Sequence, residues 1–466
     1  MTAFKAYDIR GRVGDELDAA FMFGVGAVFG AEVAQQAPVA VGFDARDSSP
    51  MLADALADGL ISAGADVLWL GLCGTEEVYF ATDHLGAGGG LMVTASHNPI
   101  GDNGLKLVGR NATPIGRESG LARIEAQWRS PPKSSARGRR RTVAPRDAYV
   151  ARVLSFIEPQ ALAPHHLLVN AGNGAAGPTF DAIADALAAA GSPLRFERLF
   201  HEVDPRFPNG IPNPLLPQNH GPTTAAIQSS GADLGVAWDG DFDRCFFFDG
   251  QGRFVDGVYV VGLLAAAMLA RHPGETVVYD PRAVLNTRAM VQAAGGRAVM
   301  ARTGHSYMKA AMRAQRAFYG GEMSAHHYFR DFMFCDSGMI PWLLVVEAMS
   351  REEASLDALV ADRIAAFPVS GELNFTCADP RAAIASVEAA YASNAHTRDD
   401  SDGLSLEFDG WRLNLRRSNT EALLRLNVEA AGDRARVDAE VAQISALIEA
   451  VSAPADHSET RPQESV

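Results

Sequence analysis

The sequence has few cysteines and no paired cysteine motif. Its 466 residues include only four cysteines, which are far apart and never in C-x-x-C spacing: Cys73, Cys245, Cys335 and Cys377. Disulfide frameworks and zinc sites need paired or clustered cysteines, so neither is expected here. We expect reduced thiols in a protein of the cytoplasm.

Long apolar runs are also missing. The most apolar stretch, residues 258–270, is about a dozen residues long, too short to cross a bilayer core of roughly 30 Å. The first residues show no basic segment followed by a long apolar one, which a signal peptide would need. We therefore expect a buried helix at 258–270 and no membrane partner.

The chain has fewer basic than acidic residues, which gives it a formal net charge of −15. The summed field disfavours nucleic acid as a partner, although a local basic pocket can still hold a small anion. The run Arg139-Arg140-Arg141 is an exception. Because it lies among prolines and serines in residues 130–146, it indicates a loop or interdomain connector more than a nucleic-acid patch.

A chain of this length predicts several domains of roughly 100–150 residues each. Short β-branched runs alternate with Ala-rich amphipathic segments through the first three quarters, which is typical of mostly parallel α/β sheets. We predict three similar mixed-sheet α/β domains at 1–145, 146–249 and 250–365 around one central cleft. A smaller α+β domain at 366–453 and a disordered tail at 454–466 follow.

Strands are expected at residues 38–43, 66–70, 90–93, 167–169, 194–199, 234–238, 245–248, 276–279, 298–301 and 317–319, and helices at 51–63 and 180–189. In the last domain, strands are expected at 371–376, 404–408, 411–415 and 423–428, with helices at 380–391 and 433–451. In open parallel sheets ligands bind at the carboxyl ends of strands. Each α/β domain ends its last strand in a polar loop, so three loops are expected to face one cleft.

The first of these loops, residues 94–99, carries the hydroxyl nucleophile Ser96. A serine there can carry a transferable group. The G-x-S-x-G elbow of serine hydrolases is absent, and adjacent residues such as Ser96 and His97 are expected to point apart, which disfavours acyl transfer. His97 is interpreted as structural or as a phosphate donor. Lys106 follows a glycine-assisted turn and either reaches back into the site or is a solvated charge.

The second loop carries Asp239, Asp241 and Asp243 at i, i+2 and i+4, a hard-oxygen set suited to Mg²⁺. An EF-hand would need Gly and Glu where this loop has Arg244 and Gly250. Three carboxylates crowded between apolar strands would repel one another unless a cation sat among them, although a solvated acidic turn is the alternative. A phosphate on Ser96 would fit the remaining coordination positions.

The third loop, residues 320–327, offers a carboxylate, a hydroxyl and two imidazoles, which suits a polyol; a plain polar turn is equally open. At residues 302–306 a strand meets a helix, which brings His305 within reach of a substrate hydroxyl. The last loop, residues 416–420, joins paired arginines to Ser-Asn-Thr and favours an anion over a simple β-turn. Arg10, near the start, adds a weaker signal.

In this order the segments resemble the α-D-phosphohexomutase family, most closely its bacterial phosphomannomutase/phosphoglucomutase branch. The resemblance runs from residue 5 to about residue 428, and its three loop motifs at 94–99, 239–244 and 321–324 are specific in combination. It implies the following site. The catalytic residues would be Ser96 as phosphoserine, Lys106 and His305 as proton-transfer groups, and Arg10; the Mg²⁺ ligands would be Ser96, Asp239, Asp241 and Asp243; and the substrate-binding residues would be Tyr7, His97, Arg244, Arg282, Thr303, Gly304, Glu322, Ser324, His326, Arg416, Ser418, Asn419 and Thr420.

The implied reaction moves phosphate between O1 and O6 of a hexose, with mannose and glucose phosphates as substrates. Phosphoserine would donate its phosphoryl group, and a hexose 1,6-bisphosphate would be both intermediate and activator. The partners implied are small sugar phosphates, with a monomer or weak homo-oligomer. The chain departs from the family at Ala422, where relatives usually have proline, and at Arg282, where they often have lysine.

Two other functions remain open from the sequence. A phosphoglucosamine mutase uses the same parts, although Met323 and its loop context lean against it. A non-catalytic sugar-phosphate sensor would bind the same ligands without isomerising them.

Overall fold

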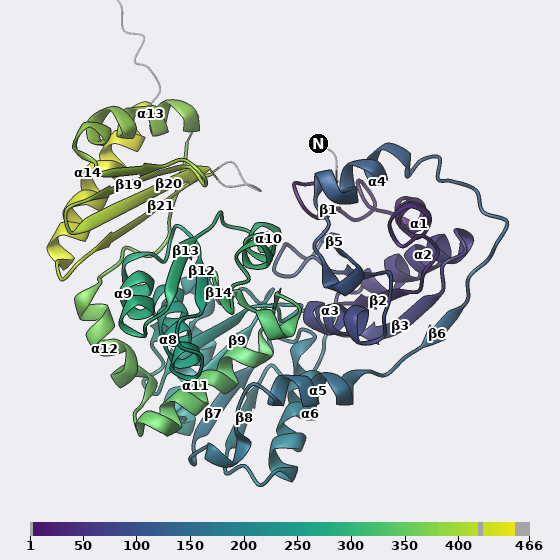
Figure 1. The fold of residues 1–466 in the computed structure, drawn as a ribbon, viewed down its shortest axis with the longest axis horizontal. Coiled ribbons are helices and arrows are strands. Elements are labelled where there is room, and N and C mark those ends of the chain that lie inside the picture. The colour runs from purple at the N-terminus through teal and green to yellow at the C-terminus, as the bar shows by residue number, and fades with distance from the viewer. Residues whose placement is uncertain (1–2, 378, 418–422, 453–466) are drawn as a thin grey trace, which may run out of the picture. The chain divides into compact units, whose positions relative to one another are not determined.

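The computed structural model describes residues 3–377, 379–417 and 423–452 (Figure 1). The chain divides into two compact units, Met1–Asp362 and a second that starts at Arg363. The described residues form four separate sheets, three in the first unit and one in the second. Among the described residues, none of the helices combines the length and apolar character that crossing a membrane requires.

The first sheet has six strands in the order β1-β5-β4-β2-β3-β6. Strands β2, β3, β4 and β6 pair in parallel, whereas β5 runs antiparallel to β1 and β4. Since the chain crosses from β2 to β3 in one direction and from β3 to β4 in the other, right-handed crossovers put α2 and α3 on opposite faces. The bounds are β1 (Ile9–Arg12), α1 (Ala19–Val28), β2 (Val39–Phe43), α2 (Ser49–Ser62), β3 (Val67–Leu72), α3 (Thr75–His84), β4 (Gly89–Val93), β5 (Asp102–Gly109), α4 (Ala122–Gln127) and β6 (Arg140–Thr142).

The second sheet has the order β11-β10-β9-β7-β8 and the third β13-β12-β14-β15-β16. Both mix parallel and antiparallel pairs. The segment that forms the second sheet comprises α5 (Arg146–Leu154), β7 (His166–Asn170), α6 (Ala176–Ala189), β8 (Arg195–Leu199), α7 (Gly221–Ser230), β9 (Leu234–Trp238), β10 (Cys245–Asp249) and β11 (Phe254–Val255). The segment that forms the third sheet comprises α8 (Gly257–Arg271), β12 (Thr276–Tyr279), α9 (Leu285–Ala293), β13 (Arg297–Met300), α10 (His305–Gln315), β14 (Tyr319–Gly321), β15 (His327–Phe329), β16 (Cys335–Asp336) and α11 (Met339–Glu352).

Helix α12 (Leu356–Ala366) spans the boundary at which the second unit begins. The second unit has one fully antiparallel sheet, β17-β21-β20-β19-β18. Its own apolar core joins this sheet to two helices. The bounds are β17 (Leu373–Thr376), α13 (Pro380–Tyr391), β18 (Thr397–Asp399), β19 (Leu404–Phe408), β20 (Trp411–Arg417), β21 (Leu423–Ala430) and α14 (Arg434–Ser452).

The predicted fold class is confirmed: three mixed-sheet α/β domains precede an antiparallel α+β domain. Helix α8 is the buried helix expected at 258–270, and its N-cap Asp256 accepts a hydrogen bond from the backbone N–H of Val258. The four cysteines are buried and are not joined in disulfide bonds. The domain boundaries within the first unit stay predictions, and the predicted tail lies outside the described residues.

Three local predictions are wrong. The turn expected before Lys106 is strand β5, because Gly104 permits close strand packing: a Cβ there would lie 2.3 Å from the carbonyl oxygen of Ile9. The connector at 130–146 contains edge strand β6, where Arg140 lies over the Trp69 ring and pairs with Asp54. The strand expected at 317–319 begins at residue 319 and ends at Gly321.

Candidate active site

Ser96 follows β4 and lies in a strained, buried loop. Its φ of +52° is in the left-handed region, which non-glycine residues rarely adopt, and its side chain is almost inaccessible to solvent. Its N–H donates to Thr94 Oγ1 at 2.8 Å, and its hydroxyl donates to Asp239 Oδ2 at 2.5 Å. The expectation that Ser96 and His97 point apart is wrong, because the left-handed backbone brings Ser96 Oγ within 3.0 Å of His97 Nδ1.

The three aspartates after β9 form a compact, buried carboxylate cluster. One oxygen from each of Asp239, Asp241 and Asp243 lies within 4.8 Å of the others. Within the described part of the chain, Asp241 Oδ1 and Asp243 Oδ1 have no hydrogen-bond partner. Buried carboxylate oxygens without donors are costly unless a cation binds them. The donor set therefore fits a hard divalent cation such as Mg²⁺.

Cations of the protein itself already offset part of the charge of these carboxylates. Lys106 Nζ donates to Asp241 Oδ2 at 2.7 Å and also to Asp243. Arg244 Nε donates to Asp239 Oδ2 at 2.8 Å. Burial alone would lower the pKa of Lys106, but the carboxylates of Asp241 and Asp243 outweigh it and raise the pKa above its usual value. Lys106 is thus an ammonium here.

Two arginines complete the positive lining of the serine loop. Arg10 Nη1 donates to the carbonyl oxygen of Thr94 at 2.6 Å, and its Nε pairs with Asp8 at 2.9 Å. Arg244 also donates to His97 Nδ1. Burial first, and then the charge of Arg244, lower the pKa of His97 well below its usual value. His97 is therefore a neutral acceptor for Arg244, and its role as a structural residue or as a phosphate donor stays a prediction.

The loop after β14 gathers the residues expected to bind a polyol. Glu322 is buried, and it accepts hydrogen bonds from the Gly304 N–H at 2.8 Å and the Tyr328 hydroxyl at 2.5 Å. Arg282 Nη2 lies 3.3 Å from Ser324 Oγ and 3.8 Å from Glu322 Oε1. These contacts join Gly304, Glu322, Ser324 and Arg282 in one polar cluster.

His305, the first residue of α10, lies edge-on to Tyr7, with ring centroids 4.7 Å apart. Neither of its ring nitrogens has a hydrogen-bond partner within the described chain, and neither does the hydroxyl of Thr303. Burial, reinforced by the charges of Lys309 and Lys106, lowers the pKa of His305 well below its usual value. A neutral imidazole with open nitrogens is chemically able to accept a proton from a substrate hydroxyl.

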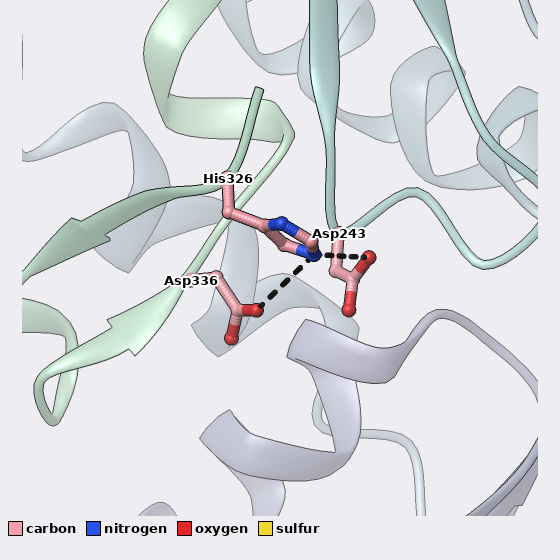
Figure 2. Close-up of side chains that lie close together, drawn as sticks. All are labelled: Asp243, His326 and Asp336. Carbon is pink, nitrogen blue, oxygen red and sulfur yellow. Dashed lines mark ion pairs between the residues drawn. The ribbon is translucent and has the colours of Figure 1, made fainter. Parts of the chain in front are cut away.

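His326 lies between the loop after β14 and the carboxylate cluster, and Figure 2 shows its ring between Asp243 and Asp336. Its Nε2 lies 3.6 Å from Asp243 Oδ1 and 4.0 Å from Asp336 Oδ2, and its Nδ1 lies 3.4 Å from Glu322 Oε2. Burial would lower the pKa of His326, but Asp243 and Glu322 raise it above its usual value. The loops after β4, β9 and β14 therefore converge, as expected from the carboxyl ends of their strands.

Four residues that support these loops were not predicted from the sequence. Thr75 donates its hydroxyl to Asp241 Oδ2 at 2.5 Å, and the fully buried Lys309 lies 2.7 Å from Asp336 Oδ1. Asp44 and Arg46 follow β2, which pairs in parallel with β4. The rule that found Ser96 would have found these two, because the strand at 38–43 also ends in polar residues.

Arg416 belongs to the second unit and lies on β20. Its side chain is buried, and Nη2 donates to Glu372 Oε2 at 2.8 Å. The other predicted phosphate-binding residues, Ser418, Asn419 and Thr420, lie outside the described residues, as does Ala422.

Comparison with known proteins identifies all four domains. The phosphoglucomutase/phosphomannomutase domain models match in order: alpha/beta/alpha domain I at residues 1–133, domain II at 147–252, domain III at 256–367 and the C-terminal domain at 372–447. These spans cover most of the chain.

Full-length relatives and a solved structure agree. A phosphomannomutase of Salmonella typhimurium is 52% identical over 452 residues, covering 96% of this chain and 99% of the relative. A protein of Xanthomonas campestris named "Phosphohexose mutases" is 51% identical over 452 residues, with the same coverage. A crystal structure of a phosphoglucomutase/phosphomannomutase family protein from Burkholderia thailandensis is 31% identical with a TM-score of 0.85, covering 97% of this chain and 99% of that one. The chain belongs to the phosphoglucomutase/phosphomannomutase family.

Proposed function

We propose that this hexose phosphate mutase moves phosphate reversibly between O1 and O6 of mannose and glucose phosphates, through phosphorylated Ser96 and a hexose 1,6-bisphosphate. The P–O bond to Ser96 breaks as a P–O bond to the free sugar hydroxyl forms, and that hydroxyl loses its proton. The bisphosphate then returns its other phosphoryl group to Ser96, so no phosphate is consumed.

The observation that carries the proposal is the hydrogen bond from the Ser96 hydroxyl to Asp239, at 2.5 Å, in a buried loop lined by Arg10, Arg244 and Lys106. Phosphate monoesters are among the slowest bonds to break without a catalyst, so developing charge must be neutralised. Three cations bound to the serine loop and to the neighbouring carboxylates meet that need. A hydrolase does not require so much positive charge around its nucleophile.

The carboxylates of Asp239, Asp241 and Asp243, together with a phosphate oxygen on Ser96, would hold Mg²⁺. When bound, this ion would withdraw charge from the transferring phosphoryl group. Thr75 keeps Asp241 oriented through its hydroxyl, and Arg244 does the same for Asp239. Lys106 would give up part of its contact with Asp241 and Asp243 to the ion and turn toward substrate.

Proton transfer would be divided between two groups with opposite protonation states. His305 is neutral with open ring nitrogens, which suits a proton acceptor at the attacking hydroxyl. Lys106 carries a proton that it could give to the leaving oxygen, and loss of its contacts with Asp241 and Asp243 to the ion would lower its raised pKa and ease that transfer. Such pairs of oppositely tuned groups mark acid and base assignments. In the reverse direction the two roles exchange.

The hexose ring would be held by Glu322, Ser324 and Arg282, and His326 would contact both ring and phosphate. Arg416 with Ser418, Asn419 and Thr420 would hold the phosphate that is not reacting. We place this activity in the cytoplasm, with sugar phosphates as the partners.

The test is direct. Glucose 1-phosphate and mannose 1-phosphate are each supplied with Mg²⁺ and a trace of the corresponding 1,6-bisphosphate, and the 6-phosphates are measured. We expect both to be isomerised, and glucosamine 1-phosphate to be used far less well. Binding without isomerisation would overturn the proposal and leave a sugar-phosphate sensor.

A further inference from the structure

Behind the Ser96 loop lies an arginine that none of the proposed catalytic steps uses. Arg46 is only 2% exposed and follows β2, next to the strand that leads to Ser96. Its guanidinium donates to four main-chain carbonyl oxygens of one loop: Pro99 at 2.8 Å, Asp102 at 3.1 Å, Asn98 at 2.5 Å and Ser96 at 3.0 Å. Four bonds from one side chain to a single loop make it a scaffold for that loop.

Asp44 holds the other side of the same turn. Its Oδ2 accepts from the Thr94 hydroxyl at 2.7 Å and from the Ala95 N–H at 3.3 Å. Its Oδ1 accepts from the Arg46 N–H at 3.0 Å and from the Ser49 hydroxyl at 2.6 Å. Thr94 in turn accepts from the Ser96 N–H. The loop is thus held on one side by a carboxylate and on the other by a guanidinium.

This clamp addresses a specific physical problem at Ser96. A non-glycine residue in the left-handed region is strained, and it persists only when its surroundings over-determine its conformation. The loop must also keep one shape whether Ser96 carries a hydroxyl or a dianionic phosphate. A planar guanidinium with several fixed donors is suited to that role, whereas a lysine ammonium has only three donors and no fixed fork.

We propose that Arg46 is a positioning residue for phosphoryl transfer, which fixes the main chain of residues 96–102 so that Ser96 Oγ stays aligned with Asp239. It does not touch substrate. The proposal rests on the proposed function for its kinetic consequence and on the loop contacts alone for its structural consequence. The two consequences are tested separately.

The structural test uses wild-type protein and hydrogen exchange. The amides of Asn98 and Asp102 donate within the loop, at 2.9 and 3.0 Å. We expect their exchange to be as slow as that of β4 amides, and Arg46→Lys to speed it by about tenfold or more. Rapid exchange of both amides in wild-type protein would overturn the proposal, whether or not the protein isomerises any sugar phosphate.

The kinetic test compares Arg46→Lys and Arg46→Met with Arg140→Met, a control in the same domain. Arg140 also contacts an aromatic ring and a carboxylate, but it lies on an edge strand away from Ser96. We expect Arg46→Lys to lower kcat by about 100-fold and to leave KM within about threefold. Phosphoserine hydrolysis per turnover should rise. The control should behave as wild type.

A folded Arg46→Met or Arg46→Lys variant with kcat within about threefold of wild type would overturn the proposal. A purely structural role would lower thermal stability without changing the ratio of hydrolysis to isomerisation, and that result would also contradict it. If wild-type protein does not isomerise hexose phosphates, the proposed function fails, and the exchange experiment still decides the role of Arg46.

Discussion

Gly240, between Asp239 and Asp241, packs against the main chain of Ser96. The substitution Gly240→Ala should therefore push these two loops apart by a distance that the structure gives. A Cβ at this position would lie 2.5 Å from the carbonyl oxygen of Ser96 and 3.3 Å from its carbonyl carbon. Ordinary van der Waals contact starts near 3.4 Å, so the two loops must separate by about 0.9 Å. Ser96 cannot give way freely, because the same carbonyl oxygen accepts from Arg46 at 3.0 Å.

We expect Gly240→Ala to lower kcat by about 100-fold, since a displacement of about 1 Å in an aligned site costs that much. Overpacking should also lower the free energy of unfolding by about 1–3 kcal/mol. Gly221→Ala is the matched control, because nothing lies within 4 Å of its Cβ position. Steady-state isomerisation of mannose 1-phosphate measures the effect. A folded Gly240→Ala protein with wild-type kcat would refute the reasoning.

Three further predictions follow from the structure. Ser96→Ala should abolish isomerisation and leave sugar-phosphate binding, measured by calorimetry, largely intact; near-normal turnover would exclude Ser96 as the carrier. Asp336→Asn leaves Lys309 as a buried, uncompensated charge and should lower the unfolding free energy by about 3–5 kcal/mol in urea titrations, with Lys309→Met added to it restoring much of the loss. Burial lowers the pKa of His327 to about 3. As the pH falls below about 6.5, this histidine therefore takes up a proton in the unfolded state but not in the folded state, and the free energy of unfolding falls by about 2 kcal/mol at pH 5. His327→Asn should remove that dependence in paired titrations at pH 7 and pH 5, and an unchanged slope would contradict it.

Much of the fold could be predicted because apolar runs fix strand positions whatever the tertiary context. The strands at Leu234–Trp238 and Thr276–Tyr279 and the helix at Pro380–Tyr391 have the bounds that the pattern predicts. A glycine accounts for one of the three local errors. Before Lys106 the pattern Asn-Gly indicated a turn, but Gly104 serves close packing against Ile9, which depends on a strand far away in the sequence.

The parts of the candidate site that could be predicted are those whose reactive side chains lie close together in the sequence. The three aspartates and the serine loop are such segments. Contacts between residues far apart in the chain could not be predicted from the sequence. Examples are the contact of Lys106 with Asp241 and that of Arg46 with Ser96. The left-handed backbone at Ser96 is likewise a product of its surroundings, and it reversed the expected orientation of His97.

The proposed reaction requires Ser96 to carry the transferred phosphoryl group. The most direct measurement is mass spectrometry of proteolytic peptides after the protein is incubated with glucose 1,6-bisphosphate and Mg²⁺, and again after excess glucose 6-phosphate is added. We predict one phosphoryl group on the peptide that contains Ser96, assigned to that residue by fragmentation, and its transfer to the added sugar. Full isomerase activity with Ser96 never phosphorylated, or with the phosphate on another residue, would contradict the account.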